Sequence, residues 1–356
     1  MKKIISAILM MSMILTFALT GCGGNGSESA GSGESSSSPG AMPGEGKRIA
    51  LVSDIAGTQV FVLSMIDGLN ASAEKYGFEP IVVECADSAA YEDNIRALVE
   101  EGTDLIIGGG WLSADPLNKI ASEFPDKAEY ALIDSEVEAE NVKCISYREQ
   151  EGAYLIGKIA ASVVDEGTTM FGAVHVTQGP SSFKWRYGYM EGVKTIIPEA
   201  KFVFNYVGNY NDPAQAKESA LLQSEQGCQF INSAAAGGDI GVFEAALEKN
   251  FYTSGQDVDL TDPDNPYIVS CQIKDTKATV EYLMDMYFSA DWDTDDIVLG
   301  VAEGAIGAVH ITHESPNPIS DRLSEEEISA VKQAVEDIGN GKIDLANVPD
   351  EENYQY

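Results

Sequence analysis

The chain has 356 residues, of which 57 are acidic and 22 basic, and 44% of it is hydrophobic. This length and apolar content suffice for two packed domains. The net charge of −35 excludes most nucleic-acid binders, because phosphate contacts need clusters of basic residues. It also excludes attachment to anionic lipid by a polybasic face. We therefore expect no nucleic-acid partner.

The N-terminus has the features of a secretory signal. Lys2 and Lys3 precede an apolar stretch, Ile4 to Leu19, which is too short for a membrane span and is followed by no stop-transfer charges. The stretch ends in Leu19-Thr20-Gly21-Cys22, which resembles a bacterial lipobox. That resemblance implies removal of residues 1–21 and diacylation of Cys22, which would anchor the protein by lipid on the extracellular face of a bacterial cell membrane. The alternative is a plain secretory signal.

Residues 22–46 have the composition of a tether. From Gly23 to Gly46, 15 residues are Ser or Gly, and such a segment cannot build a core and behaves as a flexible chain. We therefore expect a folded unit that begins near residue 47 and is joined by this tether to the lipidated Cys22.

From Arg48 onward, strand-like and helix-like segments alternate. Apolar runs of about 5 residues separated by helical segments of about 10–15 residues predict βαβ units and parallel sheets. A restart of the pattern near Gly167 indicates a second lobe, and a closed (β/α)₈ barrel is the alternative. Strands are expected at 48–53, 80–84, 104–107, 130–133, 170–176, 202–207 and 230–233, and helices at 61–76, 89–101, 114–124, 150–164, 185–197, 213–226 and 241–249.

Glycines, carboxylates and an aromatic residue lie where these predicted strands end. In open parallel sheets, ligands bind beyond the carboxyl ends of the strands. Glycine permits a close approach of the backbone to a ligand, and an aromatic ring offers a flat apolar surface. The strand ends with these features are Asp54, Gly108-Gly109-Gly110-Trp111, Gln178-Gly179-Pro180, Ala236-Gly237-Gly238 and Gln256-Asp257.

The motifs of common catalytic sites are missing from the part of the sequence expected to fold. From Arg48 onward there is neither a Gly-x-x-x-x-Gly-Lys-Ser/Thr loop nor a Gly-x-Gly-x-x-Gly loop, and no Gly-x-Ser-x-Gly elbow. The three histidines of the chain offer few candidates for general acid–base catalysis. We predict that the protein is not an enzyme and uses no cofactor. An extracellular hydrolase on a similar α/β frame is the enzymatic alternative.

Metal sites and disulfides are also weakly supported. His310 and His313 would face opposite sides of a strand, and the acidic segment Asp257 to Asp264 lacks the central Gly and final Glu of a calcium loop. The four remaining cysteines stand in or beside apolar runs at irregular spacing, which is typical of small buried hydrophobes, and one disulfide among them stays open. These cysteines are Cys85, Cys144, Cys228 and Cys271.

Five segments, in order and behind the lipobox, resemble the basic membrane protein family of substrate-binding lipoproteins, of the purine nucleoside receptor type. The family members serve ABC importers. The segments are Tyr147-Arg-Glu-Gln-Glu-Gly-Ala-Tyr-Leu-Ile-Gly157, Trp185-Arg-Tyr-Gly-Tyr-Met-Glu-Gly192, Tyr206-Val-Gly-Asn-Tyr-Asn-Asp-Pro-Ala-Gln-Ala-Lys-Glu218, Ala235-Ala-Gly-Gly-Asp-Ile-Gly-Val-Phe-Glu-Ala-Ala246, and Gly255-Gln-Asp257 followed by Lys274.

The resemblance implies a type I periplasmic-binding fold, which is an α/β fold with two doubly wound parallel-sheet lobes joined by a three-strand hinge. Lobe 1 is expected over 47–166, with part of 275–310 returning to it. Lobe 2 is expected over 167–274, and residues 311–356 are expected to complete the lobes. The implied partners are a nucleoside-like small molecule, by default a purine nucleoside, the permease and ATPase subunits of an importer, and the membrane through the lipid.

The resemblance also implies a set of ligand-binding residues. Phe61 matches the family aromatic that stacks on the base, and Asp257 and Lys274 match the polar pair that holds the ribose hydroxyls. A flat base is suited to aromatic faces, and a diol to a carboxylate beside a cationic donor. The remaining matches are Asp54 at the end of the first strand, Trp111 and Asp115 in the loop that borders the base, Trp185 in the second lobe, and Gly238.

One segment departs from the family pattern. The family usually has Asp-Asp-x-Ser-Phe-Asn around the first-lobe aromatic, whereas this chain has Gly57-Thr58-Gln59-Val60-Phe61-Val62. Val62 stands where the family has Asn, and Asp239 stands where it tends to have Thr. Because matched polar groups discriminate strongly between ligands, another small solute such as a sugar is an alternative ligand. A ligand-sensing lipoprotein that signals to a membrane receptor is an alternative function.

Overall fold

A computed structural model of the chain describes residues 42–290 and 292–354. The predicted signal sequence, the lipidation at Cys22 and most of the predicted tether lie outside the described residues. Residues from Met42 onward form one compact unit. The tether ends earlier than predicted, because Gly44 is buried and its N–H donates to the carbonyl of Tyr76 at 2.8 Å.

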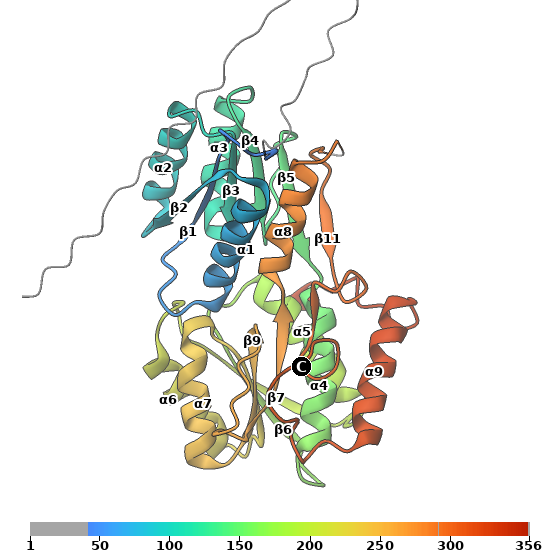
Figure 1. Cartoon of the computed structure of the whole chain (residues 1–356). Helices are drawn as coiled ribbons and strands as arrows, with labels where there is room; N and C mark the ends of the chain where they lie inside the picture. Colours follow the sequence, from blue (N-terminus) through green and yellow to red (C-terminus); the bar gives the residue numbers. More distant parts are fainter. Residues whose placement is uncertain (1–41, 291, 355–356) are drawn as a thin grey trace, which may run out of the picture. The chain divides into compact units, whose positions relative to one another are not determined.

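Lobe 1 is built on a six-stranded parallel sheet (Figure 1). Alternate residues of its first strand supply two cores: Ile49 and Leu51 face helices α1 and α8, and Ala50 and Val52 face α2 and α3. The strands are β1 (Arg48–Asp54), β2 (Glu79–Cys85), β3 (Leu105–Gly109), β4 (Glu129–Ile133), β5 (Val142–Tyr147) and β11 (Ile297–Leu299), in the order β11-β5-β4-β3-β1-β2. The helices are α1 (Val60–Tyr76), α2 (Ser88–Glu100), α3 (Ala114–Glu123) and α8 (Thr276–Tyr287).

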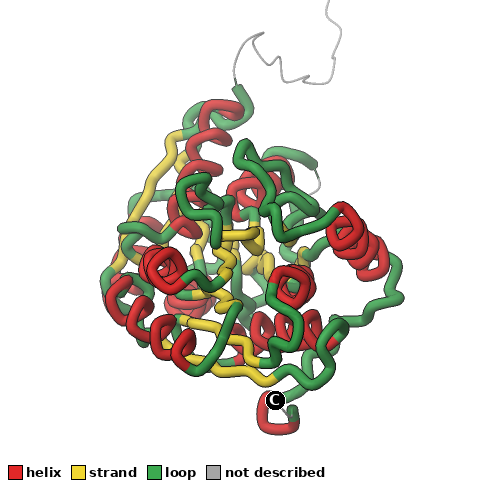
Figure 2. The backbone as a smooth tube through the Cα atoms, turned by 90° about the horizontal axis from the view of Figure 1, so that it is seen from below, coloured by secondary structure: helices red, strands yellow, loops and turns green. Residues whose placement is uncertain are grey.

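Lobe 2 repeats this plan, with β12 as an antiparallel edge strand. In Figure 2 its strands lie between flanking helices. The strands are β6 (Met170–His175), β7 (Lys201–Tyr206), β8 (Phe230–Ala234), β9 (Tyr252–Asp257), β10 (Ile268–Lys274) and β12 (Ile306–Ala308), in the order β12-β10-β9-β8-β6-β7. The helices are α4 (Glu149–Val163), α5 (Pro180–Lys194), α6 (Pro213–Glu225), α7 (Asp239–Lys249) and α9 (Glu325–Gly339). Three short 3₁₀ turns complete the list: η1 (Trp111–Ser113), η2 (Ala236–Gly238) and η3 (Glu351–Asn353).

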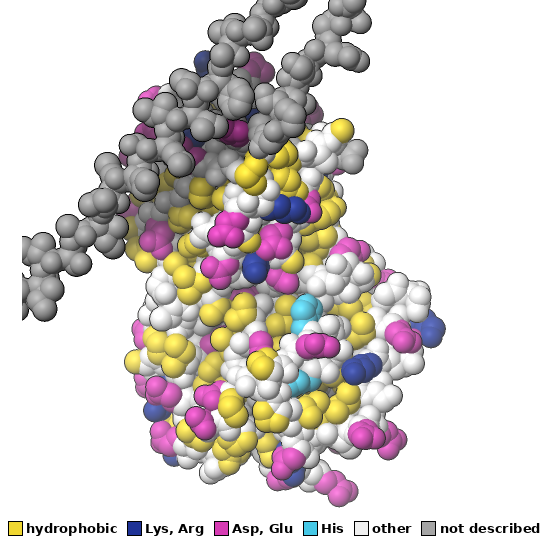
Figure 3. Space-filling view, in the orientation of Figure 1, with side chains coloured by type: hydrophobic (Ala, Val, Ile, Leu, Met, Phe, Trp, Pro, Cys, Tyr) yellow, Lys and Arg dark blue, Asp and Glu magenta, His cyan; other side chains and the backbone are white. Residues whose placement is uncertain are grey.

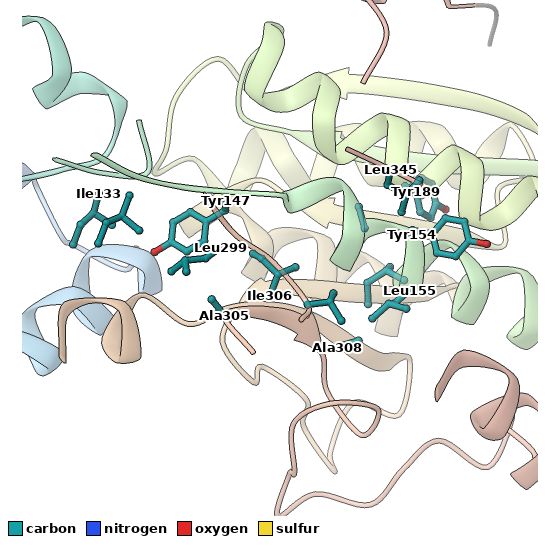
Figure 4. Close-up of a cluster of buried hydrophobic side chains, with 14 of the residues drawn as sticks. Ile133, Tyr147, Tyr154, Leu155, Tyr189, Leu299, Ala305, Ile306, Ala308 and Leu345 are labelled. Atoms are coloured by element: carbon teal, nitrogen blue, oxygen red, sulfur yellow. The ribbon is translucent and has the colours of Figure 1, made fainter. Parts of the chain in front are cut away.

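The chain passes between the lobes three times: from β5 to α4, from β10 to α8, and from β11 to β12. Helix α4 packs on α5 and β10, so it belongs to lobe 2, and the predicted lobe 1 range of 47–166 is too long at its end. The predicted range failed there because the strand-to-helix rhythm gives no sign of a change of lobe. Figure 4 shows the apolar side chains at the crossings, with Tyr147 and Leu299 between Ile133 and Ile306.

Helices α4 and α5 pack through glycines. A Cβ atom on Gly188 would lie 2.1 Å from the carbonyl oxygen of Gln150, and one on Gly192 would lie 2.2 Å from that of Tyr154. Real side-chain carbons do not approach backbone oxygens so closely, so the two helices would have to separate. Both contacts lie within two of the segments that resemble the family, because the glycines stand in 185–192 and the carbonyls that they meet stand in 147–157.

We expect Gly188→Ala to lower the free energy of unfolding by about 1–3 kcal/mol, the usual cost of overpacking a close helix contact. Urea denaturation of the two proteins measures this difference. Gly339→Ala at the end of α9 is the matched control, because its added methyl would meet no atom within 4 Å. It should leave stability unchanged or raise it slightly, since alanine favours helix. Equal stabilities of the two variants would contradict the close packing.

Candidate functional site

A cavity of about 290 Å³ lies between the lobes. Both sheets turn the carboxyl ends of their strands toward it, as expected for ligand sites in open parallel sheets. The residues at or directly after those ends that line it are Asp54 of β1, Gly109 of β3, Asp134 after β4, His175 of β6, Ala234 of β8, Asp257 of β9 and Lys274 of β10.

The structure brings six of the eight predicted site residues to this cavity: Asp54, Phe61, Trp111, Trp185, Asp257 and Lys274. The other two do not line it. Asp115 is exposed in the first turn of α3. Gly238 is buried in lobe 2, where an added Cβ would lie 3.2 Å from the side chains of Ala216 and Ala235.

Lys274 is the central cation of the site. Its ammonium donates to Asp134 Oδ1 at 2.7 Å and to Glu149 Oε1 at 3.4 Å. Asp134 follows a strand of lobe 1 and Glu149 opens a helix of lobe 2, so this ion pair joins the two lobes. The second oxygen of Glu149 lies 3.6 Å from Lys184 Nζ, which is partly exposed at the rim.

Two buried carboxyl groups, Glu149 and Asp257, and the partly buried Asp134 lie around this ammonium. Asp134, Glu149 and Asp257 together raise the pKa of Lys274 above its usual value, although burial opposes this. Burial raises the pKa of Asp257 to about 6, with Lys274 lowering it, and burial also raises the pKa of Asp134. The cluster therefore takes up a proton on Asp257 as the pH falls through about 6.

Backbone strain concentrates at the same place. Asp134 and Asp257 adopt left-handed backbone conformations, with φ of 69° and 70°, and so does Ala236, with φ of 55°. Non-glycine residues rarely take this conformation, and those that do gather at functional sites because the surrounding structure must hold them there. The strained backbone aims two of the cluster's carboxylates into the cavity region.

Aromatic rings from both lobes surround the same cation. Lys274 Nζ lies 5.5 Å from the centre of the Phe61 ring, 5.3 Å from that of Tyr147 and 5.4 Å from that of Trp185. Phe61 comes from the first turn of α1 in lobe 1, and Trp185 from α5 in lobe 2. Both rings line the cavity, so each lobe offers an aromatic side chain to a ligand held between them.

The opening of the cavity is bridged by side chains of the two lobes. Trp111 Nε1 of lobe 1 donates to the Tyr210 hydroxyl of lobe 2 at 2.5 Å, and Thr58 Oγ1 donates to Asn211 Oδ1 at 3.4 Å. A Cβ on Gly237 would lie 2.6 Å from Thr58 Oγ1, so glycine is needed for the lobes to meet here. The structure therefore shows the lobes closed on the cavity.

The segment that departs from the family pattern places one side chain in the core and another at the cavity. Val62 is fully buried in the lobe 1 core and does not line the cavity. Gln59 lines the cavity instead, and its amide donates to Asp54 Oδ2 and to the Ile55 carbonyl, both at 2.8 Å. Asp239 is also buried away from the cavity, bonded to Ser233 and to the Ala235 N–H.

Several residues that line the cavity were not predicted from the sequence. They are Gln59, Asp134, Glu149, His175 and Tyr210, together with the side chain of Gln178. Asp134 directly follows a predicted strand, which was an available signal.

Burial lowers the pKa of His175 to about 3, helped by the nearby Arg186 charge, so this histidine is neutral at physiological pH.

The remaining candidates for chemistry have structural surroundings. The four cysteines from Cys85 onward are buried free thiols, as predicted for small hydrophobes. Across residues 42–354, Asp291 aside, no group of three or more His, Cys, Asp and Glu side chains is arranged to hold a metal ion. No helix in the same part of the chain combines the length and hydrophobicity that a membrane crossing requires.

Two α/β lobes that close on a cavity between their strand ends form the periplasmic-binding fold. Among solved structures, the chain resembles an ABC transporter solute-binding protein from Aeropyrum pernix K1, with a TM-score of 0.76 and 23% identity, over 86% of this chain and 95% of that one. It also resembles a solute-binding protein from Conexibacter woesei DSM 14684, with a TM-score of 0.63 and 21% identity, over 85% and 99% of the two chains.

The family model described as "ABC transporter substrate-binding protein PnrA-like" matches residues 49–342. The chain therefore belongs to this family, Bmp, as the sequence resemblance indicated. Basic membrane protein A of Borreliella burgdorferi is 27% identical over 340 residues, which cover 92% of this chain and 91% of that protein. An uncharacterized lipoprotein of Pyrococcus abyssi is 27% identical over 326 residues, 86% of this chain and 77% of that one. The family is one of substrate-binding proteins, which agrees with the prediction that the chain is not an enzyme.

Proposed function

We propose that this protein captures a nucleoside-like molecule, by default a purine nucleoside, and delivers it to the permease and ATPase subunits of an ABC importer. The observation that carries the proposal is the pair of aromatic rings, Phe61 and Trp185, that line the cavity from opposite lobes beside a polar floor, formed by Lys274 and its carboxylates. A base is flat and stacks on such rings. The ribose hydroxyls can donate to Asp134 or Asp257 and accept from Lys274.

The charge of the site supports a neutral ligand. The cavity is lined by Asp54, Asp134, Glu149 and Asp257, with Lys274 as its buried cation. Acidic side chains also outnumber basic ones on the face displayed in Figure 3. A phosphate group would meet like charge at close range, so a nucleotide is a poor fit and an uncharged nucleoside a good one.

We further propose that Cys22 carries the lipid anchor, as its lipobox-like setting implies, and that the binding unit works at the extracellular face of the membrane. Relatives described as lipoproteins support this placement. Delivery requires no chemistry by this chain, because closure on the ligand is a population shift that membrane subunits can recognise.

A thermal-shift screen of residues 42–356 against nucleosides, free bases, pentoses and nucleotides tests the ligand class. A ligand present at 100 times its Kd should add about 2.7 kcal/mol to the free energy of unfolding. The proposal predicts a raised melting temperature with purine nucleosides and none with their 5′-phosphates. A response to pentoses alone would replace the nucleoside with a sugar.

We expect Tyr210→Phe to weaken binding of the best nucleoside from that screen by about two- to tenfold. The lost Trp111–Tyr210 hydrogen bond joins the lobes only when they are closed, and a hydrogen bond contributes about 0.5–1.5 kcal/mol. Calorimetric titration measures the change. Tyr267→Phe is the control, because it removes a tyrosine hydroxyl that contacts Asn250 within lobe 2. If both variants bind like the unmodified protein, the contact does not contribute to closure.

A further inference from the structure

The described chain ends in a segment that lies beyond the family match. The family model covers residues 49–342, and residues 343–354, here called the C-terminal strap, return to lobe 2. The strap is held near its start by Leu345, which is buried and whose carbonyl accepts from Gln150 Nε2 at 3.0 Å.

Glu351 in the strap binds a buried arginine. Its two carboxylate oxygens accept from Arg186 Nη1 at 2.7 Å and from Nη2 at 2.9 Å, a bidentate arrangement. The Arg186 side chain is only 1% exposed. Its guanidinium also lies over three aromatic rings at 5.2–5.6 Å, those of Phe183, Phe204 and Tyr206.

This ion pair stands directly behind the ligand cavity. Arg186 is the neighbour of Trp185 in α5, and Trp185 lines the cavity. Glu351 Oε1 also accepts from Gln178 Nε2 at 3.4 Å, and Gln178 lines the cavity as well. One carboxylate of the strap therefore contacts one cavity residue and the neighbour of another.

A second anchor fixes the far end of the same helix. The Tyr354 hydroxyl donates to Glu191 Oε1 at 2.5 Å and accepts from Lys194 Nζ at 3.0 Å. Its ring also packs edge-on against Phe183 and Tyr187. The strap thus contacts α5 in its first turn and in its last turn.

We propose that the C-terminal strap positions the lobe 2 wall of the ligand cavity, with Glu351 as the positioning residue that acts through Arg186 and Gln178. Without the carboxylate, the buried guanidinium loses its bidentate acceptor, and the first turns of α5 shift with it. A binding site loses affinity when its supporting residues no longer hold the contact residues in place. The proposal rests on the proposed function only in taking this cavity as the ligand site.

The first test needs no ligand. In a Trp111→Phe/Trp292→Phe background of residues 42–356, which form one compact unit, the fluorescence comes from Trp185. We expect Glu351→Gln to raise the acrylamide quenching constant of this emission about twofold or more, because a buried indole becomes accessible when its supporting contact is lost. Glu352→Gln, an exposed neighbour with the same change of charge, should leave quenching unchanged.

The second test measures affinity for adenosine and inosine with all tryptophans in place. Glu351→Gln should raise the Kd about tenfold, Glu351→Asp should restore part of the affinity, and Glu352→Gln should leave it unchanged. If Glu351→Gln does not fold, Arg186→Met/Glu351→Met removes both charges together and should still raise quenching.

The outcomes separate this proposal from the proposed function. Raised quenching in a protein that binds neither nucleoside would support the strap and remove the nucleoside as ligand. Quenching and Kd that match those of Glu352→Gln in every folded variant would overturn the strap proposal and reduce the segment to a surface covering.

Discussion

Replacing Lys274 with methionine is expected to abolish ligand binding and to lower the free energy of unfolding by about 3–5 kcal/mol, the usual cost of removing one partner from a buried ion pair. The ammonium is the shared partner of Asp134 and Glu149, and it lowers the pKa of Asp257. Without it, the buried Glu149 and Asp257 and the partly buried Asp134 lose the cation that they share.

The loss of stability should depend on pH. Removal of Lys274 raises the pKa of Asp257 further above about 6. A carboxyl group with a raised pKa in the folded state favours folding while it is protonated and loses that contribution as the pH rises. The deficit should therefore be largest near pH 8 and shrink toward pH 5. Urea denaturation at both pH values measures it.

Lys184→Met is the matched control for this prediction. It removes the same charge from the same cluster, but Lys184 lies 3.6 Å from Glu149 and is partly exposed, so water can replace it. Its effect should stay within about 1 kcal/mol, as for exposed ion pairs. Equal losses in Lys274→Met and Lys184→Met would contradict the central role given to Lys274.

Replacing both Phe61 and Trp185 with alanine is expected to weaken nucleoside binding by about 2–6 kcal/mol, because stacking of one base on one aromatic ring contributes about 1–3 kcal/mol. Each single variant should lose about half of this. Titration calorimetry with adenosine measures the four proteins.

Trp292→Ala is the control for the aromatic pair. Trp292 packs against Tyr287 and donates to Glu129 in lobe 1, away from the cavity lining. The Trp292→Ala variant should bind adenosine as the unmodified protein does. Unchanged affinity in the double variant would mean that the rings do not contact the ligand.

Much of the fold could be predicted from the sequence, because apolar periodicity follows burial. The predicted strand at 48–53 and helix at 61–76 match β1 and α1 to within a residue. Strand β5 was missed because Lys143 interrupts its apolar run. That lysine is buried because its ammonium donates hydrogen bonds to Asp293 Oδ1 at 2.7 Å, 150 residues away, and to the Asp295 carbonyl at 3.0 Å. Helix α5 begins five residues before the predicted start, at Pro180, although proline is common at the first position of a helix.

The site could be predicted only in part, because some of its contacts join residues that are far apart in the sequence. Asp54 and Asp257 end strands, and a strand end is visible in the sequence. The cluster around Lys274 joins Asp134 and Glu149 to a residue 140 and 125 positions further along the chain, and only the meeting of the two lobes places them together. Val62 and Gln59 show a second limit. A position in a motif does not tell whether its side chain points into the core, as that of Val62 does, or lines the cavity, as that of Gln59 does.

The most direct test of the central claim is a calorimetric titration of residues 42–356 with adenosine, adenine, ribose and adenosine 5′-monophosphate. The account predicts one binding site that takes adenosine about tenfold or more tighter than adenine or ribose, because both the rings and the polar floor are used, with no binding of the monophosphate. Tight binding of ribose together with silence from adenosine would contradict it. That result would leave the two-lobed solute-binding fold in place and assign the cavity to a sugar.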